Sequence, residues 1–166
     1  DEVIVVGAQA IYLRTGSATV AVAEATKDSD FVIDPRHLPD DPLIEEAMAA
    51  ADFKLNLDKR NPGAWVSSTG IPVDLMVPGE LSGVSAQHRG ARIPPHSAKA
   101  TRRTVGLEAC VVDYDEMLIP SLTEDDRRQT TARVAGVAAL IIAKVHKLHE
   151  RINEPHRLND KDAHDI

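Results

Sequence analysis

Apolar residues alternate with polar ones, or gather in short β-branched runs, at several places along the chain. The run EVIVV at residues 2–6 ends at Gly7, which predicts a buried strand followed by a turn. Residues 8–14 then suit a short helix that a glycine can stop. The alternating run DSDFVID at residues 28–34 predicts the next strand. The chain is therefore expected to open as strand, turn, helix and strand.

The middle of the chain predicts a helix and a small meander. Asp40 or Asp41 is expected to cap the helix, with Pro42 at its first position and LIEEAMAAADF as its body. Three short strands should follow, separated by NPG and TG, at residues 53–57, 64–68 and 71–77. Such short strands with tight punctuation are typical of an antiparallel arrangement.

The last part of the chain predicts one or two strands at residues 101–113 and then a long helix. The acidic residues after Thr123 suit a helix start, and apolar positions recur at helical spacing from Val134 to Leu148. We therefore predict an α/β (α+β) fold, in which residues 1–120 form a small mixed sheet with flanking helices. Residues 121–166 are predicted to add a helical segment.

Composition and charge narrow the classes of protein. The 166 residues are 43% hydrophobic, as expected for one globular domain or slightly more. No apolar run approaches 18 residues and the chain starts acidic, so we expect no membrane span, no signal peptide and a cytoplasmic location. The net charge of −7 argues against indiscriminate binding to nucleic acid. A single cysteine excludes an intramolecular disulfide.

Three aspartates are the strongest chemical signal. Asp28 and Asp30 are two apart on a predicted strand, so their side chains share a face with Cα atoms roughly 7 Å apart. Asp74 interrupts the apolar run IPVDLMV, where an unpaired charge would cost several kcal/mol to bury. Carboxylates arranged in this way suit a two-metal site for Mg²⁺ or Mn²⁺, which could hold an NTP by its phosphates. The alternative is that Asp28 and Asp30 lie in a solvated loop.

Basic residues gather in the segment 86–103, which contains no acid. They are Arg89, Arg92, Lys99, Arg102 and Arg103, with His88 and His96. The segment can collect phosphates of an RNA or can be a solvated loop that neutralises neighbouring acids. Lys144, on the long predicted helix, can likewise lay its stem along apolar surface without a ligand. Trp65 is expected to pack in the core rather than to stack on a base.

Several of these motifs together resemble the nucleotidyltransferase superfamily. They are Gly7 and Ala8 after an apolar strand, TKDSD at residues 26–30, and PVDL at residues 72–75. Lys144, Arg157 and KDAHDI at residues 161–166 are similar to the later motifs of the AbiEii-type branch, which contains toxins of bacterial toxin–antitoxin systems. The resemblance covers most of the chain.

The resemblance implies a role for each matching residue. Asp28 and Asp30 would hold the metals and Asp74 would help to activate the acceptor hydroxyl. Lys144 would contact the triphosphate, and the backbone N–H groups at Gly7 and Ala8 would bind phosphate. The implied reaction is metal-dependent nucleotidyl transfer from an NTP to a hydroxyl, and the implied partners are tRNA, at its 3′ end, and a cognate antitoxin.

Two alternatives stay open at the level of sequence. Ala8 stands where the superfamily usually has Ser, and a long insertion precedes Asp28, which favours an inactive nucleotide-binding or partner-binding module. The acidic net charge favours a small-molecule nucleotidyltransferase, which would modify a hydroxyl of a cationic antibiotic. The identity of the labelled product after incubation with each NTP would distinguish the three functions.

Overall fold

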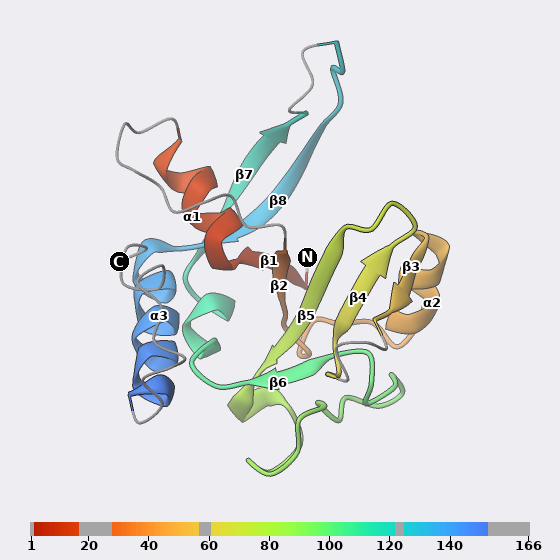
Figure 1. Ribbon diagram of the computed structural model, residues 1–166, viewed down its shortest axis with the longest axis vertical. Helices are drawn as coiled ribbons and strands as arrows, with labels where there is room; N and C mark the ends of the chain where they lie inside the picture. Colours follow the sequence, from red (N-terminus) through yellow and green to blue (C-terminus); the bar gives the residue numbers. More distant parts are fainter. Residues whose placement is uncertain (1, 17–27, 57–60, 122–124, 153–166) are drawn as a thin grey trace.

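The computed structural model describes residues 2–16, 28–56, 61–121 and 125–152, and the mixed α+β class predicted above is confirmed (Figure 1). These residues form one eight-stranded sheet. Its strands are β1 (Val3–Val6), β2 (Ser29–Ile33), β3 (Phe53–Leu55), β4 (Ala64–Ser67), β5 (Pro72–Pro78), β6 (Arg102–Thr104), β7 (Tyr114–Pro120) and β8 (Gln129–Ala135). The helices are α1 (Gly7–Thr15), α2 (Ile44–Ala50) and α3 (Val137–Arg151), with the 3-10 turns η2 (Gly79–Leu81) and η3 (Glu108–Val111).

The sheet mixes parallel and antiparallel pairs. Its order is β3-β4-β5-β2-β1-β8-β7, and β6 pairs with β5 off this path. The predicted meander is confirmed, because β3, β4 and β5 are antiparallel neighbours. The pairs β2–β5, β1–β8 and β5–β6 are parallel. As a result, β1 and β2 lie in the middle of the sheet although they come first in the chain.

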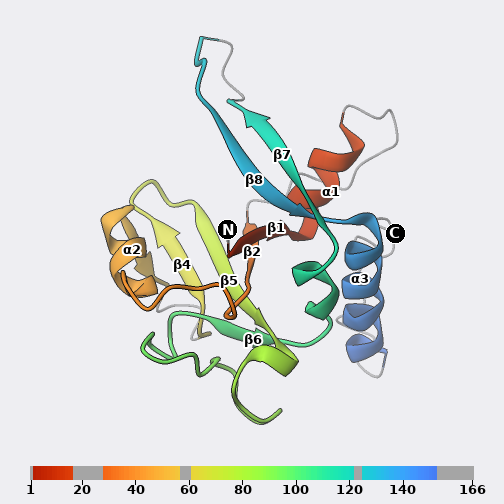
Figure 2. The same cartoon turned by 180° about the vertical axis from the view of Figure 1, so that it is seen from behind.

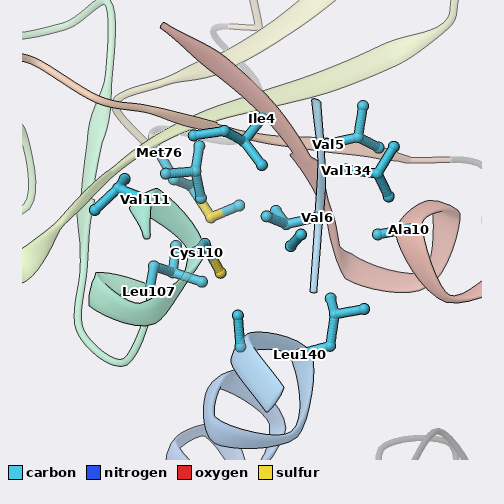
Figure 3. Packing of buried hydrophobic residues seen from close by; sticks show 13 residues of the cluster. Ile4, Val5, Val6, Ala10, Met76, Leu107, Cys110, Val111, Val134 and Leu140 are labelled. Atoms are coloured by element: carbon cyan, nitrogen blue, oxygen red, sulfur yellow. The ribbon is translucent and has the colours of Figure 1, made fainter. Parts of the chain in front are cut away.

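Strand alternation divides the core between the two faces of the sheet. On one face, Val6, Val32 and Met76 belong to a buried cluster with side chains of η3 and α3, such as Leu107 and Leu140 (Figure 3). On the other face, the cluster is built on β2 and β5 and is closed by α2 and by Trp65, whose indole N–H donates to the carbonyl of Ala100 at 2.9 Å. The core position expected for Trp65 is confirmed.

The long helix predicted from Thr123 is wrong in its first half. Strands β7 and β8 form an antiparallel hairpin there, which extends away from the rest of the sheet in both views, and α3 begins only at Val137 (Figures 1 and 2). Val134, which fits helical spacing, lies in β8 opposite Val5 of β1. Its burial therefore comes from a pairing with the distant N-terminal strand. The boundary expected between residues 120 and 121 falls inside this hairpin.

One smaller prediction, the start of the helix after Pro42, also needs correction. The helix expected from Pro42 begins at Ile44, with Leu43 as its N-cap, and the backbone N–H of Leu43 donates to Oε2 of Glu46 at 3.3 Å. Residues 101–113, where one or two strands are expected, contain one short strand, β6, followed by the turn η3. The expectations for Thr123 itself, for Arg157 and for residues 161–166 concern residues outside those described. Among the described helices, none combines the length and the hydrophobicity that a membrane span requires.

Helix α3 is capped by a residue that lies far from its own N-terminus in sequence. Its N-cap is Gly136, which has no side chain to bond the first N–H groups. Oδ2 of Asp113 instead accepts a hydrogen bond from the N–H of Ala139 at 2.8 Å. A Cβ atom at Gly136 would overlap the carboxylate of Asp113, so the glycine makes room for this cap. The contact positions the helix that carries Lys144.

Replacing Asp113 should therefore destabilise the fold. We expect Asp113→Ala to lower the free energy of unfolding by about 1 kcal/mol, because the orphan N–H of Ala139 loses its acceptor. Asp113→Asn, which keeps one acceptor oxygen, should lose less. Urea unfolding followed by circular dichroism measures both changes. Equal stability of Asp113→Ala and the original protein would show that the cap contributes nothing.

Candidate functional site

Two of the predicted aspartates lie side by side in the sheet. Asp30 of β2 pairs in register with Asp74 of β5, and on its other side Asp30 pairs with Val6, the last residue of β1. Paired residues on neighbouring strands project to the same face and lie about 4.8 Å apart. The two carboxylates therefore project from the same face of the sheet, next to the point where β1 ends and α1 begins.

The surroundings of Asp30 disfavour its charge. Burial raises the pKa of Asp30 above its ordinary value, and repulsion from Asp74 raises it further. Lys147 of α3 and Arg102 of β6 act in the opposite direction. Asp28, directly before β2, adds a smaller repulsion. The carboxylates of Asp30 and Asp74 therefore repel each other, and a cation bound beside them would relieve this repulsion.

Gly7 is the residue that lets α1 approach Asp30. Its φ of +65° is a conformation that glycine adopts readily, and a Cβ atom there would overlap Oδ2 of Asp30. Gly7 and Ala8 form the first turn of α1, where no side chain of the described residues bonds the free N–H groups. Backbone donors and carboxylates consequently meet at one place, and the donors give this end of the site an affinity for anions.

A cleft of about 850 Å³ unites the site. Every residue that sequence reasoning assigned to the site lines it, namely Gly7, Ala8, Asp28, Asp30, Asp74 and Lys144. Lys144 is buried, with 8% of its surface exposed, in the face of α3 that also presents Leu140 and Ala143 to the cleft. It therefore does not lie along the protein surface. A cleft of this size is in the range of small-molecule sites.

Two basic residues of the cleft, Arg102 and Lys147, lie near the carboxylates although the sequence analysis did not pair them with any aspartate. Nη2 of Arg102 donates to Oδ2 of Asp74 at 3.1 Å, whereas Oδ1 of Asp74 is buried and has no hydrogen-bond partner among the described residues. Lys147 lies one helical turn after Lys144 and lines the same cleft. The spacing of the two lysines was a usable signal. Nothing in the sequence pairs Arg102 with Asp74.

The basic segment 86–103 divides between two roles. His88, Arg89, Arg102 and Arg103 line the cleft, so part of the segment lies beside the carboxylates. His96 is instead buried, and its Nδ1 accepts a hydrogen bond from the N–H of Ile44 at 3.2 Å, which fixes the start of α2. Arg92 and Lys99 are exposed outside the cleft.

Asp34, the last residue of the run DSDFVID, serves a different purpose. It follows the end of β2 and is 3% exposed. Arg36 donates to both of its carboxylate oxygens, from Nε at 2.9 Å and from Nη2 at 2.7 Å. These hydrogen bonds hold the pKa of Asp34 below its usual range. Asp34 therefore fixes the turn after β2 and does not belong to the cleft.

The carboxylates of the cleft fit a hard divalent cation. Two of them lie at paired positions, and one offers a buried oxygen that lacks a partner within the described part of the chain. Residues 2–16, 28–56, 61–121 and 125–152 contain no ready group of three His, Cys, Asp or Glu side chains that could hold a metal. The paired carboxylates of Asp30 and Asp74 suit Mg²⁺, which is commonly held by one or two carboxylates together with substrate phosphates and water.

Comparison of the chain with protein-family models, with curated proteins and with solved structures finds no match.

Substitution of Gly7 tests how closely α1 approaches the carboxylates. We expect Gly7→Ala to lower the free energy of unfolding by about 1–3 kcal/mol, because the methyl group adds an overlap with Asp30 to the cost of a positive φ. Gly16→Ala is the matched control, since Gly16 has a φ of +59° and nothing within 4 Å of its added Cβ. Thermal unfolding of both variants isolates the overlap. Equal losses would contradict the close approach.

Protonation of Asp30 should make stability depend on pH. The pKa of Asp30 is raised in the folded state, so protonation of Asp30 stabilises the fold. This contribution to the free energy of unfolding is complete below the pKa of an unfolded aspartate, about 3.9. The contribution is lost as the pH rises through the folded pKa. Asp30→Asn should remove this loss, so the variant should melt higher than the original protein at pH 7 without metal. Melting temperatures across pH 4–8 measure the difference, and parallel curves would contradict it.

Proposed function

We propose that this chain is a metal-dependent nucleotidyltransferase, which moves a nucleotide from an NTP to a hydroxyl acceptor and releases pyrophosphate. The observation that carries the proposal is the in-register pair Asp30 and Asp74 at the N-terminus of α1. Carboxylates for cations and free backbone N–H groups for phosphate occur together in one cleft, with Lys144 on its wall. An NTP with its divalent cation needs both kinds of group.

Each residue of the cleft has a role in this reaction that follows from its chemistry. Asp28, Asp30 and Asp74 would hold Mg²⁺ or Mn²⁺, which when bound neutralises phosphate charge and lowers the pKa of an oxygen that it contacts. Lys144 and the N–H groups of Gly7 and Ala8 would bind and orient the triphosphate. The burial of Lys144 limits the number of positions that its ammonium group can take.

Asp74 is the residue proposed to take the proton of the acceptor. Its Oδ1 is buried and without a partner in the described residues, so this oxygen can accept a hydrogen bond from an incoming hydroxyl. As that proton moves to Oδ1, the hydroxyl oxygen bonds to the α-phosphorus. The bond from the α-phosphorus to the bridging oxygen of the β-phosphate breaks, and pyrophosphate leaves.

The cations at the cleft favour an anionic acceptor over a cationic one. His88, Arg89 and Arg103 lie on its wall, where they can contact the phosphates of an RNA. An RNA acceptor such as the tRNA 3′ end, a cytoplasmic location and a role as the toxin of a toxin–antitoxin pair belong to this proposal. The competing function is an inactive binding module, favoured by the methyl group of Ala8 in place of a phosphate-binding hydroxyl.

Incubation with each labelled NTP, Mg²⁺ and either total tRNA or an aminoglycoside panel tests the proposal. Label in RNA supports the proposed acceptor, and label in the drug would replace it with a small-molecule acceptor. Binding of the NTP without transfer to any acceptor would leave the inactive module. Calorimetry of Mg²⁺ with and without a non-hydrolysable NTP analogue measures the expected cooperation of metal and nucleotide.

Substitution of Asp74 tests its role in the chemistry. We expect Asp74→Asn to lower the transfer rate by about 10²–10⁴-fold, because an amide cannot accept the proton, while NTP binding weakens only in part. Its metal-free melting temperature should be equal or higher, because repulsion from Asp30 disappears and the amide oxygen can still accept from Arg102.

Asp52→Asn is the matched control for this substitution. Asp52 lies outside the cleft in an exposed turn at a φ of +60°, which asparagine tolerates. The control should keep both activity and stability. If Asp74→Asn keeps its activity and loses stability, Asp74 is a structural hydrogen-bond acceptor instead.

A further inference from the structure

Strand β6 delivers a cation to Asp74 from within the fold. Arg102 pairs with Met76 of β5, and Met76 projects to the same face as Asp74 because the two are two residues apart. The guanidinium then reaches back along β5 and donates to Oδ2 of Asp74 at 3.1 Å. The side chains are 29% and 14% exposed, so water screens this ion pair only in part.

The pairing leaves Asp74 half engaged. Arg102 bonds Oδ2, while Oδ1 is buried without a partner among the described residues. A guanidinium is permanently charged, carries only donors and matches a phosphate as well as a carboxylate. A divalent cation that approaches Asp74 therefore meets a positive charge already in place. A triphosphate in the same cleft is an alternative partner for that charge.

We propose that Arg102 is a built-in counter-ion that withholds Asp74 from free divalent cations and releases it when the triphosphate of an NTP takes the guanidinium. The inference rests on the proposed function for the identity of this anion. Arg102 thus controls access to Asp74 in the free protein and contacts the triphosphate in the complex. Because the nucleotide releases Asp74 for the metal, metal and nucleotide should bind cooperatively, and the carboxylates receive the cation together with the substrate that needs it.

Mn²⁺ binding to the full chain, followed by electron paramagnetic resonance, tests this proposal without any measurement of transfer. The original protein and Arg102→Gln are titrated with Mn²⁺ alone and with Mn²⁺ plus a non-hydrolysable NTP analogue. We expect Arg102→Gln to bind Mn²⁺ alone about tenfold more tightly, because the competing charge is gone. In Arg102→Gln, the gain in Mn²⁺ affinity that the nucleotide causes should be about ten times smaller than the gain in the original protein.

Arg103→Gln is the matched control, because it removes a neighbouring positive charge that lines the cleft on the same strand. It should change Mn²⁺ binding without nucleotide much less than Arg102→Gln does. Arg102→Lys, which keeps the charge but not the planar fork, should lie between Arg102→Gln and the original protein. It also supplies the test if the glutamine variant does not fold, which circular dichroism will show.

The outcomes separate the two proposals. Equal Mn²⁺ affinity of the original protein, Arg102→Gln and Arg102→Lys, or equal effects of Arg102→Gln and Arg103→Gln, would overturn the role of Arg102 and leave nucleotidyl transfer intact. The expected tightening together with a failure of transfer to any acceptor would support the role of Arg102 and overturn the enzyme. Absence of Mn²⁺ binding in every protein, with or without nucleotide, would overturn both.

Discussion

The repulsion between Asp30 and Asp74 is the constraint around which the rest of the cleft is arranged. Parallel pairing of β2 and β5 holds the two carboxylates side by side, and burial limits how far water can screen them. The neighbouring elements reduce this cost from different directions, since Arg102 arrives from β6 and Lys147 from α3. A cation bound beside Asp30 and Asp74 would reduce the remaining repulsion further.

The three aspartates could be predicted from the sequence because their signals are local. Two aspartates at alternate positions share a strand face whatever the strand pairs with, and one charge within an apolar strand needs a special environment. Gly7 was likewise marked by its position after a buried strand. The structure explains its importance in a way that the sequence could not, because the overlap that excludes a side chain involves Asp30, which lies far along the chain.

The features that the sequence did not predict all depend on contacts between distant segments. The β7–β8 hairpin resembles a helix start because of its acidic residues, and only its pairing with β1 makes it a strand pair of the sheet. Asp113 caps α3 from outside the helix, so no local capping pattern marks the true start at Val137. The contact of Arg102 with Asp74 depends on the register of β6, which a three-residue strand does not reveal.

The central place of β1 has a consequence for how the molecule is made. Ile4 lies beside Arg133 of β8, so β1 gains this neighbour only after the more than 120 intervening residues have been synthesised. Contacts of such long sequence separation slow folding. Arg14 of α1 also contacts β8, because its Nη2 donates a hydrogen bond to the carbonyl of Val134 at 2.8 Å. A nascent chain that carries all three aspartates can therefore still lack α3 and Lys144, and gains the complete cleft only after α3 has been synthesised.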